Sequence, residues 1–268
     1  MGPKGKGPSG GKHWLEEGGQ CCHRYEEGQI GDVAGEAQRL PGDIGFEVLD
    51  VTNPGQFAFP EDLDVLVNNA GIRLKNLPIE ETPVDEWRLY MEVNFLGSVE
   101  MARRAIPILR NGGGGTIVNI NSASTLLPLP FLGPYRAAKG ALASFSETLR
   151  TETAPFGIRV VEIMPGAVTT GLTSGSMTTK VADAVDYPVY APMARRQREY
   201  FTANALKSLE AAEAAKVIVD AVEDRSGRFR YGTDERSDVS IGQWRPGGGD
   251  PVMSDFIEQM IPGSASDN

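Results

Sequence analysis

Five short stretches rich in apolar and β-branched residues recur along the chain and predict the strands of a sheet. They cover residues 45–49, 63–68, 116–120, 159–164 and 228–231. The third stretch alternates and is rich in Val and Ile, a pattern that favours a strand covered on both faces. Because segments with a helical pattern separate the strands, the sequence predicts an α/β fold.

Apolar positions in the intervening segments follow the helical period. The helix of residues 85–109 is apolar around much of its circumference and is therefore expected to be buried on more than one side. Thr82 is its predicted N-cap, followed by Pro83 at the first helical position, and Ser208 is the predicted cap of the last helix. The helices predicted in this way cover residues 32–40, 85–109, 137–153 and 209–222.

Three other segments lack a regular pattern. Three prolines punctuate residues 126–134 and predict a loop, whose leucines and Phe131 either belong to the core or line an apolar pocket. Residues 171–204 mix methionine and aromatic residues with polar ones, and the tail of residues 232–268 is predicted to be loop-like. Trp244, Phe256 and Ile257 are the tail residues that could fold back over such a pocket.

Composition and charge restrict the classes of function. The 268 residues include 26 lysines and arginines and 36 acidic residues, a net charge of −10, which argues against nucleic acid and anionic membranes as partners. The two cysteines, Cys21 and Cys22, are adjacent and offer neither a disulfide framework nor a metal site. A reducing, cytoplasmic location is expected, and no apolar run is long enough to span a membrane.

Candidate chemistry is concentrated between the third strand and the helix that follows it. Ser122 lies just past the predicted strand, and Tyr135 and Lys139 are four residues apart at the start of the helix, hence on one helical face. A lysine ammonium beside a phenol favours the phenolate, so Tyr135 could exchange a proton with an alcohol or carbonyl oxygen. Ser122 could hydrogen-bond the same oxygen. The alternative is an ordinary solvated helix face.

Further motifs occur around this stretch in a fixed order. The second strand ends in Asn68-Asn69-Ala70-Gly71, Asn94 lies within the long helix, and the fourth strand is followed by Pro165-Gly-Ala-Val-Thr-Thr170. Together with the serine and Tyr-x-x-x-Lys, these motifs resemble the short-chain dehydrogenase/reductase family from about residue 45 to about residue 231. The resemblance implies a doubly wound Rossmann-type parallel sheet with helices on both faces.

The resemblance also implies a role for each matching residue. Tyr135 would be the general acid/base, Lys139 would lower its pKa and bind the nicotinamide ribose, Ser122 would orient the substrate oxygen, and Asn94 would hold a water linked to Lys139. The cofactor would be NAD or NADP. Its adenosine side would be lined by Asp50, Asn69, Ala70 and Gly71, and its nicotinamide carboxamide would be fixed by Pro165, Gly166, Val168 and Thr170. No metal is expected.

The N-terminal segment departs from the family pattern. The family has an apolar first strand followed by Gly-x-x-x-Gly-x-Gly, which holds the cofactor pyrophosphate at a helix N-terminus. That spacing does not occur in residues 1–43, and Gly5-x-Gly7-x-x-Gly10 has no preceding strand. We therefore divide the chain into an atypical segment, residues 1–29, and a single Rossmann-type domain, residues 30–268. A replaced N-terminus is one hypothesis for this departure.

By the same resemblance, residues 171–204 are a substrate lid, and the substrate is a secondary alcohol or ketone, apolar or bulky. The other interpretation of this segment is a surface helix pair. A homodimer or homotetramer is expected. The predicted activity is that of an NAD(P)-dependent alcohol dehydrogenase or carbonyl reductase. Two alternatives are a cofactor-deficient relative that acts as a binding subunit and a lyase or dehalogenase that uses Ser122 and Tyr135; Lys139 and residues 165–170, both nicotinamide-side features, argue against the second.

Overall fold

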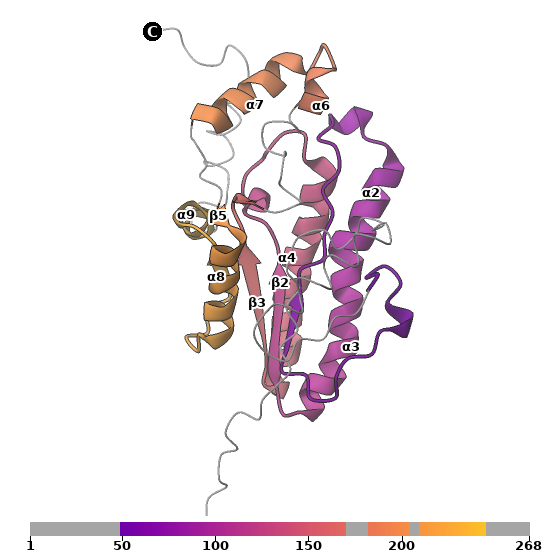
Figure 1. Cartoon of the computed structure of the whole chain (residues 1–268), viewed down its shortest axis with the longest axis vertical. Helices are drawn as coiled ribbons and strands as arrows, with labels where there is room; N and C mark the ends of the chain where they lie inside the picture. Colours follow the sequence, from indigo (N-terminus) through magenta and orange to yellow (C-terminus); the bar gives the residue numbers. More distant parts are fainter. Residues whose placement is uncertain (1–48, 170–181, 204–208, 245–268) are drawn as a thin grey trace, which may run out of the picture.

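A computed structural model describes residues 49–169, 182–203 and 209–244 of the chain. In this part of the chain, four parallel strands form the main sheet in the order β1-β2-β3-β6 (Figure 1). Their bounds are Val65–Asn68, Gly115–Ile120, Ile158–Met164 and Arg230–Gly232. Four of the predicted strands are thus confirmed, the last beginning two residues late. The predicted strand at residues 45–49 lies outside the described residues except for Leu49, which has no regular structure.

Helices cover both faces of this sheet (Figure 1). The helices on one face are α2 (Val84–Met91), α3 (Gly97–Asn111) and α4 (Gly133–Thr153), and on the other face lies α8 (Ala211–Glu223). The remaining helices are α6 (Ala182–Val185), α7 (Ala191–Ala203) and α9 (Glu235–Trp244), and β4 (Val168–Thr169) pairs with β5 (Leu209–Glu210). Short helical turns are η1 (Pro54–Gln56), η2 (Ile79–Glu81), η3 (Glu92–Leu96), η4 (Ala123–Leu126) and η5 (Ala154–Phe156).

Strand alternation divides the core into two layers. Ile117 and Val160 belong to the cluster on the α3 and α4 side, whereas Val118 and Val161 belong to the cluster that includes Ala221 of α8. Both layers are apolar because both faces of the parallel strands are covered. The α4 side becomes polar toward the carboxyl ends of the strands, where the candidate chemistry lies.

The predicted helix at residues 85–109 is one continuous helical run, α2, η3 and α3, with a π-turn in the middle at η3. Its predicted cap is wrong. Pro83 is the N-cap, and the Thr82 hydroxyl instead donates to the Pro78 carbonyl at 2.8 Å. Proline fixes an extended approach to the helix, so the cap position falls one residue later than a threonine-based prediction places it.

Two predictions near the C-terminus are corrected. The helix predicted from residue 209 begins at Ala211, because Leu209–Glu210 pairs with β4 and Glu210 caps α8 through a reciprocal bond pair with Glu213. The predicted cap, Ser208, lies outside the described residues. Residues 232–268 are not all loop-like, since α9 begins after Asp234, whose carboxylate accepts the Ser237 backbone N–H at 2.9 Å as an N-cap does.

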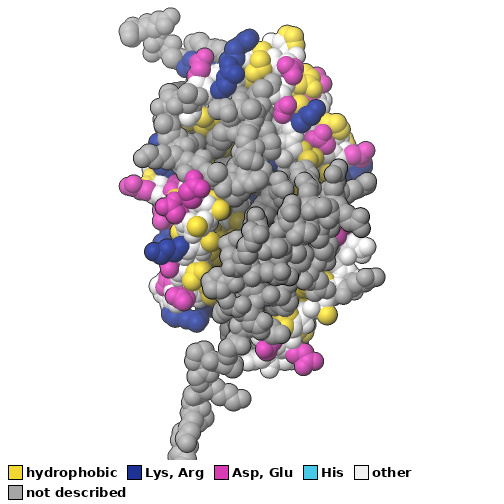
Figure 2. Space-filling view, in the orientation of Figure 1, with side chains coloured by type: hydrophobic (Ala, Val, Ile, Leu, Met, Phe, Trp, Pro, Cys, Tyr) yellow, Lys and Arg dark blue, Asp and Glu magenta, His cyan; other side chains and the backbone are white. Residues whose placement is uncertain are grey.

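Several other predictions fall on residues that the structure does not describe. These are the helix at residues 32–40, the first part of the segment 171–204, and Phe256 and Ile257 of the tail. The described part of the segment 171–204 consists of α6, α7 and the turn between them. No helix of the described residues is long and apolar enough to cross a membrane. On the face shown in Figure 2, acidic and basic side chains of the described residues are interspersed.

Candidate active site

Ser122, Tyr135 and Lys139 are brought together at the carboxyl end of β2. Ser122 follows the strand and is the N-cap of η4, where its Oγ accepts the Ser124 backbone N–H at 3.2 Å and lies 2.8 Å from the Ser124 hydroxyl. Tyr135 and Lys139 lie in the first two turns of α4, whose start is favoured by Pro134. Both residues therefore lie on one face of α4, and Lys139 reaches the end of β2.

Tyr135 is buried, with only 8% of its surface exposed. Burial raises the pKa of its phenol above the usual value, because the charged phenolate is poorly solvated there. Two neighbours act in the opposite direction and lower this pKa: a side-chain hydrogen bond with Ser122 and the positive charge of Arg73. The Ser122 and Tyr135 hydroxyls are therefore adjacent, as exchange of a proton with a shared substrate oxygen requires.

Lys139 is equally buried, with 5% of its surface exposed, and its Nζ donates to the Ile120 carbonyl at 2.7 Å. Burial lowers the pKa of the ammonium to about 8, and the negative charge of Glu162 acts against this shift. An ammonium carries three donors, so two more are available for hydroxyl groups of a ligand. The lysine is thus held by the end of β2 and stays mostly protonated at neutral pH.

A buried polar seam runs under α4 beside Lys139. Asn68 of β1 donates to Asn119 of β2 at 2.8 Å, and Asn119 donates to the Ser146 hydroxyl of α4 at the same distance. Ser146 in turn donates to the Leu142 carbonyl at 2.8 Å. Each side-chain donor named in this series of hydrogen bonds has an acceptor. The seam therefore fixes α4 over the strands without leaving one of these buried donors unsatisfied.

The seam continues into a charged group that the sequence analysis missed. Glu162 of β3 is fully buried, and it accepts hydrogen bonds from Asn121 and from the Arg230 Nε, each at 2.5 Å. Arg230 also forms an ion pair with Glu147 of α4 at 2.8 Å. A glutamate within the apolar run of residues 160–164 is the signal that could have revealed this group, because such a buried charge must be paired.

The loop after β1 also lies near the candidate catalytic residues, since its Arg73 contacts the Tyr135 ring. Asn94 in η3 is fully buried and holds Ile72 at two points: its Oδ1 accepts the Ile72 N–H at 2.7 Å, and its Nδ2 donates to the Ile72 carbonyl at 2.9 Å. Asn69 and Gly71 are half-buried and Ala70 is buried in the same loop. The Asn94 side chain thus fixes this turn, and its predicted water link to Lys139 stays a prediction.

Asp50 is exposed, and its Oδ1 accepts from the Thr52 N–H and hydroxyl.

Arg73 of this loop and Tyr90 of α2 both contact the Tyr135 ring. The sequence analysis did not name them as site residues. The Arg73 guanidinium carbon lies 5.9 Å from the centroid of the Tyr135 ring. The Tyr90 ring packs edge-on against Tyr135 with centroids 6.3 Å apart, and its oxygen accepts the Leu74 N–H at 2.6 Å. No sequence pattern signals either contact, since both depend on how the loop folds.

The predicted nicotinamide-side motif follows β3. The Gly166 N–H donates to the Thr233 hydroxyl at 3.3 Å, and a side chain at position 166 would place its Cβ 2.2 Å from Asp234 Oδ2. A larger residue at position 166 would therefore have to displace the Asp234 side chain, which precedes α9. Pro165 is half-buried, Val168 is buried in β4, and Thr170 lies outside the described residues.

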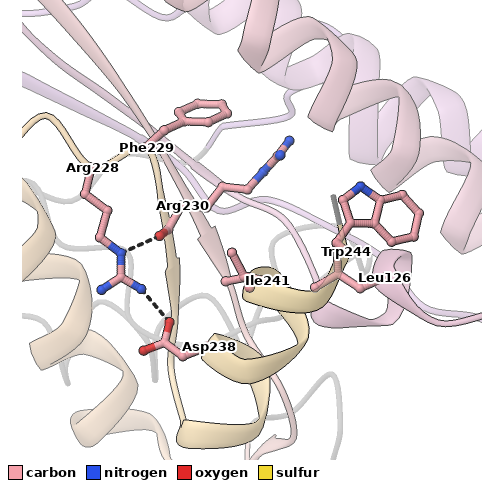
Figure 3. A pocket seen from close by; sticks show the side chains of 8 residues that line it. Leu126, Arg228, Phe229, Arg230, Asp238, Ile241 and Trp244 are labelled. Atoms are coloured by element: carbon pink, nitrogen blue, oxygen red, sulfur yellow. Dashed lines mark hydrogen bonds and ion pairs between the residues drawn. The ribbon is translucent and has the colours of Figure 1, made fainter. Parts of the chain in front are cut away.

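A cavity of about 420 Å³ lies on the other side of η4, between β6 and α9 (Figure 3). Leu126, Phe229 and Trp244 are among its lining residues, and none of the three candidate catalytic residues is. Its two arginines are engaged: Arg228 pairs with Asp238 at 2.6 Å, and Arg230 belongs to the Glu162 group. The three candidate catalytic residues therefore lie outside this cavity. Among the described residues, no cluster of metal-ligating side chains is found.

Comparison with known families assigns the chain to a class of protein. The family model for short chain dehydrogenases matches residues 46–180, half of the chain. The chain belongs to the short-chain dehydrogenase family. The match begins after the atypical N-terminal segment and contains the candidate catalytic residues.

Individual relatives support the same assignment. An uncharacterised oxidoreductase of Bacillus subtilis (strain 168) is 35% identical over 170 residues, which cover 63% of this chain and 60% of the relative. A cyclopentanol dehydrogenase of Comamonas sp. (strain NCIMB 9872) is 36% identical over 157 residues, 56% of this chain and 60% of the relative. The chain thus spans about 60% of the length of these relatives.

Solved structures show the same fold. A short-chain dehydrogenase of Burkholderia phymatum in complex with NAD has a TM-score of 0.63 at 22% identity, covering 81% of this chain and 80% of that one. A short-chain dehydrogenase of Burkholderia cenocepacia in complex with NADP has a TM-score of 0.61 at 20% identity, covering 82% and 84%. The predicted Rossmann-type α/β fold with a parallel sheet is confirmed.

Proposed function

We propose that the chain is an NAD(P)-dependent alcohol dehydrogenase or carbonyl reductase that interconverts a secondary alcohol and its ketone. The observation that carries this proposal is the burial of Tyr135 next to Ser122, with Lys139 one helical turn away. Membership of an oxidoreductase family and the NAD and NADP bound in structural neighbours support the choice of cofactor. The preference between the two cofactors is left to experiment.

The side chains of the site divide the chemistry among them. In the oxidation direction, the Tyr135 oxygen takes the hydroxyl proton of the alcohol while Ser122 holds the same oxygen by a hydrogen bond. The Lys139 ammonium, anchored on the Ile120 carbonyl, has donors left for ribose hydroxyls and contributes positive charge to the site. A bound nicotinamide supplies the hydride acceptor.

The residues present fit the nicotinamide half of such a cofactor. The donor set is suitable, since a buried ammonium lies one helical turn from the tyrosine, and the turn after β1 contains Ala70 and Gly71, small residues that let a ligand approach the backbone. For the pyrophosphate half, residues 1–43 contain no family glycine spacing. The roles of Asp50, Asn94 and residues 165–170 toward the cofactor stay predictions.

We also propose that residues 171–204 form the substrate lid, supported by the packing of α6 and α7. Phe131, from the loop between Ser122 and Tyr135, is buried against the two helices, together with Ala184 and Ala194. Its ring packs edge-on against Tyr190, and its φ of 62° is left-handed, a strained conformation for a bulky residue. Such strain is often stored at functional sites. This apolar cluster supports an apolar or bulky substrate. The similarity to a cyclopentanol dehydrogenase supports the same substrate class.

Three broader predictions accompany this function. Residues 30–268 are expected to form a single domain. The chain is also expected to form a homodimer or homotetramer. Exposed apolar side chains on η2, α2 and η3, namely Ile79, Val84, Leu89 and Leu96, support association of copies. A cytoplasmic location stays the expectation from the cysteine content.

A second candidate function is a non-catalytic binding subunit. The observation that favours it is the missing glycine spacing in residues 1–43, since the phosphate cradle supplies backbone donors and a helix dipole that no later motif replaces. A subunit of this kind would keep the fold and the catalytic side chains without turnover.

One experiment separates the two candidates. The full chain is assayed with NAD and NADP against cyclic and linear secondary alcohols, and with NADH and NADPH against the matching ketones, following absorbance of the reduced nicotinamide. Turnover that is abolished in Tyr135→Phe supports the dehydrogenase. A folded parent chain that turns over none of these pairs, with either cofactor, supports the binding subunit.

A further inference from the structure

We propose that Arg73 is a positioning residue for Tyr135: its guanidinium, fixed over the tyrosine ring, stabilises the negative charge that the phenol oxygen gains when it gives up its proton. This inference rests on the proposed function of Tyr135 as the acid/base. It assigns to a residue of the loop after β1 a task that the resemblance gave to Lys139 alone.

The loop holds Arg73 from both sides. The preceding residue, Ile72, is bound through its N–H and its carbonyl by the Asn94 side chain, at 2.7 and 2.9 Å. The following residue, Leu74, donates its N–H to the Tyr90 hydroxyl at 2.6 Å. Asn94 and Tyr90 are themselves buried in the helical run that begins with α2. The backbone of Arg73 is thus fixed relative to the helices that flank Tyr135.

The side chain of Arg73 points its charge at Tyr135. Its guanidinium carbon lies 5.9 Å from the centroid of the Tyr135 ring, within the range of a cation–π contact. Its Nε is buried, so this charge is partly shielded from water and acts more strongly than an exposed one. The same positive charge lowers the pKa of the Tyr135 phenol against the effect of burial.

The other groups around Tyr135 do not supply the positive charge that would stabilise its phenolate. From the loop after β2, the Ser122 hydroxyl contributes a hydrogen bond but no charge. From α2, Tyr90 is neutral, because burial raises its pKa to about 12, and Glu86 adds a negative charge beside Tyr90. On α4 itself, Lys139 directs its ammonium to the Ile120 carbonyl and faces Glu162.

Arginine suits this position better than lysine for two physical reasons. A guanidinium stays charged at any pH at which the enzyme folds, whereas a partly buried ammonium loses its proton readily. Its planar group also stacks over an aromatic ring. Replacement by lysine should therefore retain only part of the effect.

The test is the titration of Tyr135 itself, which needs neither cofactor nor turnover. Ultraviolet phenolate absorbance of the full chain is followed against pH, and the contribution of Tyr135 is obtained by subtracting the same curve for Tyr135→Phe. The measurement is repeated with Arg73→Gln, with Arg73→Lys, and with Tyr135→Phe in each of these backgrounds. Arg88→Gln is the matched control, because it removes one positive charge from exposed α2 surface, where Arg88 pairs with Asp85.

In Arg73→Gln the titration of Tyr135 should move upward by about one pH unit, with Arg73→Lys between it and the parent and Arg88→Gln unchanged. The acid limb of the pH profile of kcat/KM should move in the same direction, so that the rate at a fixed pH on this limb falls about tenfold. An unchanged titration in Arg73→Gln, or an equal shift in Arg88→Gln, would overturn the inference.

Failure of the proposed function is distinguishable from failure of this inference. If the chain turns over no substrate but the titration shifts as expected, Arg73 acts on Tyr135 and the reaction assignment is wrong. If Tyr135→Phe abolishes turnover and Arg73→Gln changes neither the titration nor the pH profile, the reaction assignment stands and the role of Arg73 does not.

Discussion

The two candidate catalytic side chains of α4 lie one turn apart and are about equally buried, yet their electrostatic surroundings differ in sign. Tyr135 faces the guanidinium of Arg73, whereas Lys139 faces the carboxylate of Glu162. Burial disfavours the charged form of both groups, and each partner acts against burial. Each member of the pair therefore receives its opposite charge from a different part of the molecule.

The two partners are supplied by different kinds of structure. Arg73 belongs to a loop that is held by side-chain bonds to its backbone neighbours, and Glu162 belongs to β3, between two hydrogen-bonded strands. A strand position is fixed by the sheet ladder, whereas a loop position depends on a few bonds. The comparison predicts that substitutions at Lys139 and its partner Glu162 mainly change the stability of the fold. Substitutions at Tyr135 and its partner Arg73 should mainly change activity.

The largest expected effect is on the tyrosine side. Tyr135→Phe removes the proton-exchanging oxygen while keeping the ring that packs on Tyr90, so kcat should fall about 100- to 10,000-fold. The free energy of unfolding should change by only about 1 kcal/mol, since one hydrogen bond is lost. Steady-state kinetics and urea unfolding measure the two quantities. A variant that keeps more than about a tenth of the parent activity would remove Tyr135 from the reaction.

On the lysine side, Glu162→Ala should mainly destabilise the fold. It removes the fully buried partner of Arg230, leaving a largely buried cation with only Glu147, and should cost about 3 kcal/mol of unfolding free energy. Glu147→Ala is the matched control, because that carboxylate is 40% exposed and its loss should cost less than about 1 kcal/mol. Equal costs for both variants would contradict the contrast between the two partners.

Lys139 should also make stability depend on pH. Burial lowers its pKa to about 8, so above this pH the folded chain has released a proton that the unfolded chain still binds. The unfolding free energy should therefore rise with pH between about 8 and 10, by at most about 1.4 kcal/mol per unit. Urea unfolding of the parent and of Lys139→Met across this range isolates the effect, which should be missing from the variant. The same slope in both proteins would assign it to other groups.

The smallest effect concerns the support of the Arg73 loop. Tyr90→Phe removes the acceptor of the Leu74 N–H and should cost about 1 kcal/mol of unfolding free energy. The ring contact with Tyr135 is kept, so any change in the titration of Tyr135 reports on the position of Arg73. Comparison of Tyr90→Phe with Tyr90→Leu separates the hydroxyl from the ring. A loss seen only with leucine would mean that the hydroxyl bond does not position the loop.

Much of the fold and the central pair followed from local pattern. The apolar strands and the i, i+4 spacing of Tyr135 and Lys139 depend only on backbone period, and the structure shows the strands and places the pair where expected. The start of α9 was missed although Asp234 is a good N-cap, because the apolar periodicity beyond it is weak. Pro83 replaced Thr82 as a cap for reasons that only the local backbone shows.

The charged partners of the pair were beyond a pattern-based prediction. Glu162 becomes a neighbour of Asn121 and Arg230 only through the strand register that sets Glu162 beside Asn119 and Arg230. Arg73 lies between the second predicted strand and the helix of residues 85–109, and its contact with Tyr135 depends on the bonds that Asn94 and Tyr90 make to its neighbours. Long-range contacts of this kind are not encoded in sequence spacing.

The most direct test of the central claim is nicotinamide cofactor binding at the Tyr135 and Lys139 site. The full chain and Lys139→Met are titrated with NADH and with NADPH, following nicotinamide fluorescence. The account predicts saturable binding of at least one cofactor to the parent chain and at least about tenfold weaker binding to Lys139→Met, which lacks the buried ammonium. A folded parent chain that binds neither cofactor, or a variant that binds as tightly as the parent, would contradict it.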